Sequence, residues 1–212
     1  MAPLAAPITR PAGVTPALHP SPAARLALLS LLVGFGPAFA SPLRAETSLP
    51  SDAEIEIKAS FIYTLAKFVT WPARAFPHRE SPIVFCALQD DPLGAALERI
   101  SAGRTIAGRA IFVRKVASPA DSDGCHLLFI GGPVAEQMPG LLARAGSAGV
   151  LTIGEEEEFT AHGGIVRLRM NQAMVQAEVD EETAERGGLR ISSNFLRLSG
   201  IVTISNRART VP

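Results

Sequence analysis

The clearest periodic pattern along the chain is the spacing of apolar residues between Glu54 and Val69. Steps of three and four residues place a set of them on one helical face: Ile55, Ala59, Ile62, Ala66 and Val69. Ser51 followed by Glu54 has the form of a capping box, which marks the start of a helix. Trp71-Pro72 marks its end, because the residue before proline is disfavoured in the α region. The pattern predicts a helix over residues 54–69.

This predicted helix has a second apolar face, formed by Ile57, Phe61, Thr64 and Phe68. A helix that packs on one layer needs only a single apolar stripe, so two adjoining faces need two coverings. Either a C-terminal helix of the same chain covers the second face, or a second copy of the protein does. In a homodimer, Phe61 and Phe68 are the candidate contacts.

Short apolar runs alternate with helical segments from Pro82 to Ile153. Continuous apolar runs are typical of strands covered on both faces. Asp91-Pro92 has the form of a helix start. The order of elements predicts an α/β domain with a central, largely parallel sheet flanked by helices. The predicted strands are residues 82–88, 110–115, 125–130 and 150–153, and the predicted helices are residues 93–100 and 134–145.

The pattern changes after the acidic run Glu155 to Glu158. Two segments with apolar and polar residues in alternation, 165–170 and 174–179, flank a turn at Asn171-Gln172. They predict a C-terminal antiparallel hairpin. Two short terminal helices, over residues 181–186 and 193–198, are expected to follow it.

A short apolar segment near the N-terminus has the features of a secretory signal. Arg25 supplies the positive flank and residues 26–37 the apolar core, while Ala38 and Ala40 are the small residues that signal peptidase requires. A membrane span needs roughly 20 apolar residues, so cleavage after Ala40 is favoured over a retained anchor. We therefore expect a periplasmic protein with four parts: a signal peptide and Pro-rich leader (1–40), a linker (41–53), one domain (54–202) and a tail (203–212).

The charge balance bears on the class of partner. The chain has 20 basic and 20 acidic residues, and removal of residues 1–40 takes away Arg10 and Arg25 but no acid. The remaining 18 basic and 20 acidic residues include no block of Lys and Arg. Nucleic-acid binding needs a concentrated basic surface, so nucleic acid is not expected as a partner.

Two cysteines, Cys86 and Cys125, lie in the part expected to be exported. An oxidising compartment allows such a pair to persist as a disulfide. The alternative is two small buried thiols.

Residues suited to catalysis are few and scattered. His78, His126 and His162 lie in separate segments, and His126 fits a packed or hydrogen-bonded imidazole better than a catalytic one. Four consecutive carboxylates, Glu155–Glu158, cannot all converge on one cation and fit a solvated edge or a first helical turn. The sequence contains none of the common catalytic or metal-binding motifs. We expect no enzyme activity, no catalytic residue, no cofactor and no metal.

The chain resembles the YfiR-like family of small periplasmic proteins over roughly residues 54–202. The resemblance rests on the order and spacing of five stretches: Glu56 to Pro72, Asp91-Pro92-Leu93-Gly94, Cys125 to Ile130, Gly163-Gly164-Ile165-Val166, and Gly188 to Leu198.

The resemblance implies a dimeric α/β protein without catalytic activity that holds down a membrane-bound diguanylate cyclase by engaging its periplasmic sensor domain. It also implies that Cys86 and Cys125 match a cysteine pair that the family uses as a disulfide. Some relatives have a second pair in the C-terminal half, which this sequence lacks. Redox control through a second bridge therefore does not transfer to this chain.

Two functions remain open at this point. The first is a non-enzymatic regulator that represses cyclic di-GMP synthesis by binding the periplasmic domain of a membrane diguanylate cyclase. Aromatic and aliphatic anchors beside an Arg often dominate interface energies. The candidate contact residues, which could instead belong to the core, are Phe195, Leu196, Arg197, Leu198 and Ile201. The alternative is a periplasmic small-molecule-binding module that reports an unidentified ligand to another membrane receptor, such as a histidine kinase.

Overall fold

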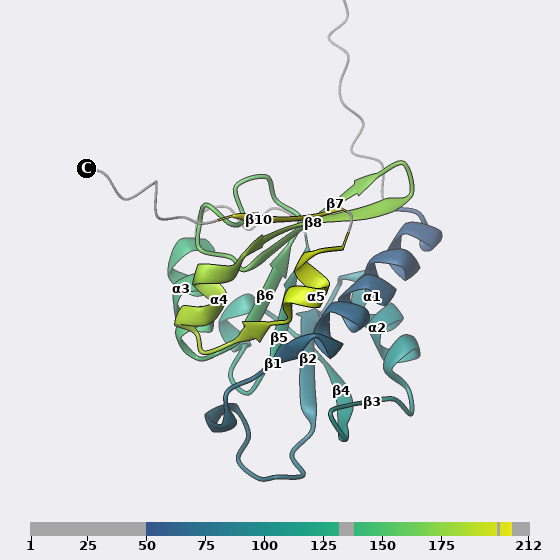
Figure 1. The fold of residues 1–212 in the computed structure, drawn as a ribbon. Coiled ribbons are helices and arrows are strands. Elements are labelled where there is room, and N and C mark those ends of the chain that lie inside the picture. The colour runs from purple at the N-terminus through teal and green to yellow at the C-terminus, as the bar shows by residue number, and fades with distance from the viewer. Residues whose placement is uncertain (1–49, 132–137, 199, 205–212) are drawn as a thin grey trace, which may run out of the picture. The chain divides into compact units, whose positions relative to one another are not determined.

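The protein has an α/β fold in which one large sheet lies between helices (Figure 1). The computed structural model describes residues 50–131, 138–198 and 200–204. Within these residues the large sheet has eight strands in the order β10-β8-β7-β6-β5-β2-β4-β3. Its neighbouring pairs are parallel except at β3–β4 and β7–β8. The predicted fold class is therefore confirmed.

The elements follow the order that the sequence predicts, with several short additions. The strands are β1 (Val69–Thr70), β2 (Ile83–Leu88), β3 (Thr105–Ile106), β4 (Arg109–Val116), β5 (Leu127–Ile130), β6 (Leu151–Gly154), β7 (Val166–Asn171), β8 (Met174–Asp180), β9 (Arg190–Ile191) and β10 (Ile201–Ile204). The helices are α1 (Asp52–Lys67), α2 (Pro92–Ser101), α3 (Met138–Ser147), α4 (Glu181–Arg186) and α5 (Ser193–Leu196), with short 3-10 turns at Ala73–Ala75 and Pro119–Asp121.

Helix α1 is the predicted N-terminal helix, with both ends two residues earlier than expected. The hydroxyl of Ser51 accepts a hydrogen bond from the backbone N–H of Glu54, which satisfies one of the free donors of the first turn. The helix ends at Lys67 because Val69 joins β1, which pairs antiparallel with β9. This small two-stranded sheet ties the end of α1 to the C-terminal part of the chain.

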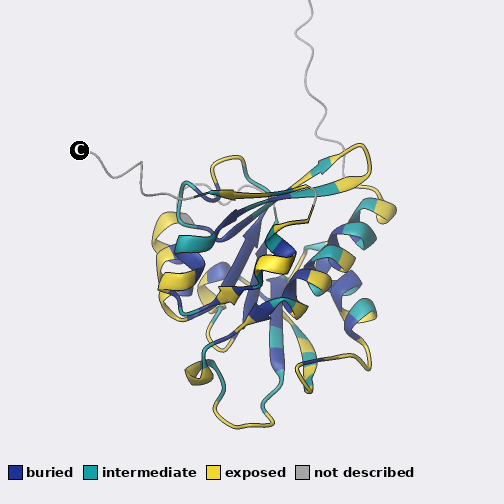
Figure 2. Ribbon diagram, in the orientation of Figure 1, coloured by how far each residue is buried: buried dark blue, intermediate teal, exposed yellow. Residues whose placement is uncertain are grey.

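The alternation of side chains along the central strands divides the core into two clusters. Phe85 of β2 and Phe129 of β5 pack into the larger cluster together with α1 and α2. Cys86, which follows Phe85, and Leu128, which precedes Phe129, point to the other face. They belong to the second cluster, which includes Leu142 of α3. Helices α2 and α3 therefore cover opposite faces of the sheet. Figure 2 shows the central strands almost wholly buried.

Further boundaries also differ from the sequence-based expectation. Strand β5 begins at Leu127 and not at residue 125, and part of the helix expected at 134–145 lies outside the described residues. Helix α5 stops at Leu196, after which Gly200, with a φ of 86°, turns the chain into β10. Strand β10 pairs in parallel with β8 and extends into the segment that was expected to be a tail. Short edge strands carry too little periodicity to be read from sequence.

Among the described residues, no helix is both long enough and apolar enough to cross a bilayer.

Candidate functional site: a cleft at the carboxyl ends of the parallel strands

The order of the strands creates a crevice between β2 and β5. The chain passes from β2 through α2 to β4 on one side, and then returns to β5 on the other side of β2. The two helices that follow β2 and β5 lie on opposite faces of the sheet, so they diverge beyond the ends of these strands. Ligands of open α/β sheets bind in such a crevice, outside the carboxyl ends of the strands.

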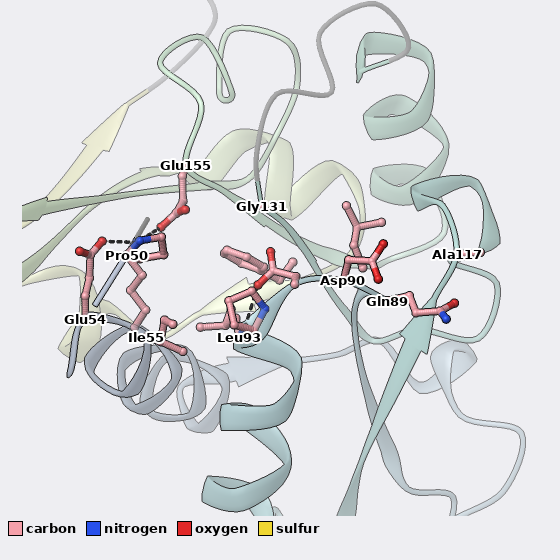
Figure 3. Close-up of a pocket in the computed structure, with 14 residues that line it drawn as sticks. Pro50, Glu54, Ile55, Gln89, Asp90, Leu93, Ala117, Gly131 and Glu155 are labelled. Carbon is pink, nitrogen blue, oxygen red and sulfur yellow. Dashed lines mark hydrogen bonds and ion pairs between the residues drawn. The ribbon is translucent and has the colours of Figure 1, made fainter. Parts of the chain in front are cut away.

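A cleft of about 600 Å³ occupies this position (Figure 3). That volume is within the usual range for small-molecule sites. Residues that directly follow four parallel strands line it: Gln89 after β2, Ala117 after β4, Gly131 after β5 and Glu155 after β6. The first turn of α1 and the start of α2 form the remaining walls. The other lining residues are Pro50, Glu54, Ile55, Lys58, Leu88, Asp90, Asp91, Pro92, Leu93 and Phe129.

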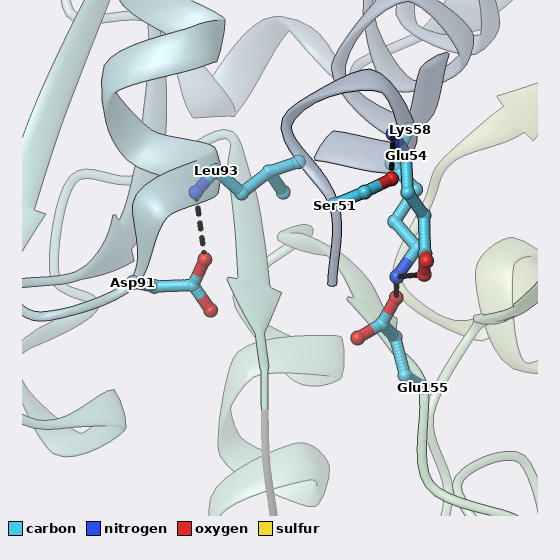
Figure 4. Close-up of polar contacts among 6 residues, drawn as sticks. All are labelled: Ser51, Glu54, Lys58, Asp91, Leu93 and Glu155. Carbon is cyan, nitrogen blue, oxygen red and sulfur yellow. Dashed lines mark hydrogen bonds and ion pairs between the residues drawn. The ribbon is translucent and has the colours of Figure 1, made fainter. Parts of the chain in front are cut away.

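Lys58 is the one basic residue among those that line the cleft, and its side chain is 8% exposed. Its Nζ lies 2.5 Å from Oε1 of Glu54, one helical turn away, and 2.5 Å from Oε1 of Glu155 (Figure 4). Burial opposes the charge of Lys58, but the two carboxylates outweigh it and raise the pKa of the ammonium. The ion pairs thus connect α1 to the end of β6.

Asp91 caps the N-terminus of α2 on the other side of the cleft (Figure 4). Its Oδ1 accepts a 2.8 Å hydrogen bond from the backbone N–H of Leu93. Burial raises the pKa of this carboxyl; the Leu93 N–H opposes the shift, and the negative charge of Glu155 adds to it. Gly131 is needed beside it, because a Cβ at that position would lie only 1.9 Å from Oδ2 of Asp91.

No pattern in the sequence predicts this cleft. The capping role of Asp91 is confirmed, but the interpretation of Glu155 as part of a solvated edge or a first helical turn is wrong. Glu155 is half-buried and pairs with a lysine almost a hundred positions earlier in the chain. The only local signal was a run of polar residues directly after predicted strands.

The candidate contact residues of the C-terminal block divide into core and surface. Phe195 is 1% exposed and belongs to the main core, so its assignment to an exposed contact surface is wrong. Leu198 is 50% exposed, Arg197 is exposed, and Leu196 and Ile201 are partly buried. Val202, in the same segment, is 54% exposed. The physical reason is the shortness of α5, which directs one aromatic ring inward and leaves the following residues at the surface.

Phe61 and Phe68, the candidate dimer contacts, are both partly buried by Phe195 of the same chain. The ring centroids lie 5.8 Å apart for Phe61 and 5.5 Å apart for Phe68. The C-terminal helix α5 therefore covers part of the second apolar face of α1. A dimer through this face stays a prediction.

Cys86 and Cys125 form a disulfide, with 5.9 Å between their Cα atoms, as predicted. The bridge lies on the face of the sheet that α3 covers. Both cysteines are buried in the same hydrophobic cluster as Leu128 and Leu142. The alternative of two buried free thiols is therefore wrong.

His126 is a packed, hydrogen-bonded imidazole, as predicted. Its Nδ1 accepts a 3.1 Å hydrogen bond from the N–H of Val84, and its Nε2 lies 3.0 Å from the carbonyl oxygen of Ala75. A backbone N–H only donates and a carbonyl only accepts, so the neutral ring with its proton on Nε2 satisfies both. The ring stacks on Phe76 at 4.6 Å.

The remaining histidines form no second candidate site within the described residues. His78 is exposed in its loop, and His162 is partly buried with its backbone N–H bonded to the carbonyl of Glu158. Within the described ranges, no group of three or more His, Cys, Asp and Glu residues could hold a metal ion. Ala38 and Ala40, the expected cleavage-site residues, lie outside the described residues.

Comparison with known proteins gives a match to one family. A family model described as YfiR/HmsC-like matches residues 55–200. A search of curated proteins found no match. A conserved domain protein from Vibrio cholerae O1 biovar El Tor is 12% identical, with a TM-score of 0.47. An ABC domain from Streptococcus pneumoniae, solved with L-Trp, is 11% identical, with a TM-score of 0.44. Each alignment covers 71% of this chain and only 60% of the other.

Proposed function

We propose that this chain, which belongs to the YfiR/HmsC-like family, is a periplasmic regulator that represses cyclic di-GMP synthesis by binding the periplasmic domain of a membrane diguanylate cyclase. The family match over residues 55–200 carries this proposal, because it covers nearly the whole folded domain. Members of this family are regulatory and not catalytic proteins. The protein would act by binding alone, with no chemical step of its own.

The proposed contact surface consists of Arg197, Leu198, Ile201 and Val202 in the C-terminal part of the chain. Leu198 and Val202 are two of the four large apolar side chains most exposed within the described residues. The neighbouring Phe195 anchors this part of the chain to the core, because its ring contacts those of Phe61 in α1 and Phe68 at the C-cap of α1. An apolar patch with an Arg beside it, mounted on a rigid core, has the composition that favours protein binding.

Genetic complementation tests the proposal. Deletion of the gene should raise cellular cyclic di-GMP and surface attachment, and the wild-type protein should restore both. Leu198→Glu should fail to restore them, because a carboxylate in the contact surface cannot be desolvated against an apolar partner. An unchanged nucleotide level in the deletion strain, with the cyclase expressed, would exclude repression.

Phe112→Glu is the matched control for this experiment. Phe112 is 60% exposed on β4, near the opposite end of the sheet from β10. The variant makes the same change from an apolar to an acidic side chain outside the proposed surface. It should restore repression, and equal loss in both variants would argue against a contact at Leu198.

Export is part of the proposal, since the partner domain is periplasmic. Cleavage after Ala40 gives a mature chain that begins at Ser41. Mass spectrometry of periplasmic protein measures this directly. A chain that retains residues 26–39 would contradict it.

A second candidate function is a periplasmic small-molecule-binding module that reports to another membrane receptor. The cleft at the strand ends favours it, because both its volume and its place in the sheet are those of ligand sites. Binding of a ligand and repression of a cyclase could reside in one protein.

A further inference from the structure

We propose that the cleft at the ends of β2, β4, β5 and β6 binds a small organic cation, in which a primary ammonium group is joined to an apolar body. This inference rests on the second candidate function and deepens it by naming the class of ligand. Three observations support it separately: the negative charge of the cleft, the hydrogen-bonded N–H groups at the start of α2, and the apolar walls.

The charge of the lining residues favours a cation. Four carboxylates line the cleft, those of Glu54, Asp90, Asp91 and Glu155, against the single ammonium of Lys58. Lys58 is engaged by Glu54 and Glu155, so the charge of Asp91 has no such neutralising ion pair among the described residues. A ligand ammonium would reduce the repulsion between Asp91 and Glu155, which face the same cleft.

The start of α2 excludes the usual anionic ligand of such a crevice. Phosphates and carboxylates bind there through free backbone N–H groups of the first helical turn. In this chain Pro92 has no N–H, and the N–H of Leu93 is bonded to Oδ1 of Asp91. The N–H of Gly94 is bonded to the Asp91 carbonyl oxygen at 3.1 Å. Asp91 thus already accepts the N–H groups of Leu93 and Gly94 that an anionic ligand would need.

Within the part of the chain that the structure describes, one carboxylate oxygen of Asp91 is left for a ligand. Its Oδ1 is used by the cap, whereas Oδ2 accepts no hydrogen bond from the described residues. The absence of a side chain at Gly131 allows Oδ2 its position next to the backbone that follows β5. A ligand ammonium at Oδ2 would form a charge-assisted hydrogen bond in a partly buried site.

The apolar walls favour an organic ion over a hydrated inorganic one. Ile55, Leu93 and Phe129 line the cleft and are each less than one-tenth exposed as residues, and Leu88 and Pro92 adjoin them. These side chains cannot coordinate a metal ion, and a hydrated ion would have to lose water against them. An apolar body would instead gain free energy by covering the more exposed apolar surface of Leu88 and Pro92 at the same wall.

Calorimetric titration with three matched probes tests the inference. The probes are 2-phenylethylammonium, 2-phenylethanol and phenylacetate, which share an aromatic body and differ in charge. The purified full-length protein should bind the ammonium at least about tenfold more tightly than either of the others. Equal or tighter binding of the alcohol or the carboxylate would overturn the inference but leave a small-molecule-binding module in place. No binding of any probe at millimolar concentration would overturn both.

Two variants connect binding to this cleft. Asp91→Asn keeps an oxygen to accept the Leu93 N–H, so it retains the helix cap while removing the charge. It should weaken binding of the ammonium about tenfold, with little effect on the alcohol. Glu56→Gln removes one negative charge from α1 outside the cleft, where Glu56 pairs with Arg99. It should bind like the wild type, and an equal loss in both variants would locate the effect in the overall charge and overturn the site.

Discussion

The aromatic ring of Phe195 packs against that of Phe68, 5.5 Å away between centroids, although the two residues are 127 positions apart. This contact fastens α5 to the end of α1. It also decides which residues of the C-terminal segment belong to the core and which are free to meet a partner.

Phe195→Ala should lower the free energy of unfolding by about 3–5 kcal/mol, because it leaves a cavity between α1 and α5. Leu198→Ala should change it by less than about 0.5 kcal/mol, because Leu198 is half exposed to water. Urea unfolding of both variants measures the difference. Similar losses would mean that Leu198 is part of the core.

Reduction of the Cys86–Cys125 bridge should destabilise the protein by about 4 kcal/mol, the chain-entropy value for a loop that spans 39 residues. The melting temperature should therefore fall in the presence of a reductant. Thiol titration of the unfolded protein should find no free thiol before reduction and two after it. Two reactive thiols without reductant would contradict the bridge.

Stability should fall as the pH drops below about 6.5, because of His126. Burial lowers the pKa of this imidazole, the carbonyl of Ala75 opposes the shift, and Arg109 adds to it. Protons therefore bind first to the unfolded chain, and the stability present above the ordinary pKa is lost as the pH falls through the folded value. Urea unfolding between pH 8 and 5 measures this.

His126→Asn provides the control for that titration. It removes the hydrogen bond to Val84 or to Ala75 and should cost about 1–3 kcal/mol at pH 8. The part of the pH dependence that belongs to His126 should then disappear. If the variant retains the same pH dependence, another group is responsible.

Asp91→Asn should stabilise the protein at neutral pH. The pKa of Asp91 is raised, so the folded carboxyl releases its proton at higher pH than the unfolded one, and ionisation costs stability as the pH rises through that window. Asparagine removes this cost and keeps the cap, whereas Asp91→Ala also loses the cap, worth about 1 kcal/mol. Thermal unfolding of the two variants at pH 7 distinguishes these effects. A less stable Asp91→Asn variant would show that the charge itself stabilises the fold.

Light scattering at tens of micromolar protein tests the predicted homodimer. If the partly buried face of α1 forms the interface, Phe61→Glu should give a monomer. Because Phe61 also contacts Phe195, circular dichroism must show that the variant is folded. A monomeric wild-type protein would end the dimer hypothesis.

Much of the fold was determined by local sequence patterns. The spacing of Ile55, Ala59 and Ile62 identifies α1, and the apolar run at residues 82–88 identifies β2. Asp91-Pro92 specifies the start of α2 because a capping side chain and a proline act within one turn. Such signals depend only on neighbours along the chain, which explains why the order of the main elements could be predicted.

The functional surfaces were decided by the tertiary structure. Lys58, Asp91 and Glu155 meet at one cleft because β5 lies beside β2 while β4 lies on its other side. Phe195 is core because it packs against Phe61 of α1 and Phe68 at its C-cap, whereas Leu198 follows the end of α5 and is half exposed. Periodicity records which face of an element is apolar, whereas the neighbours of that face depend on packing between segments far apart in the chain. The sequence by itself therefore determined the elements, and long-range packing determined which of their side chains came together.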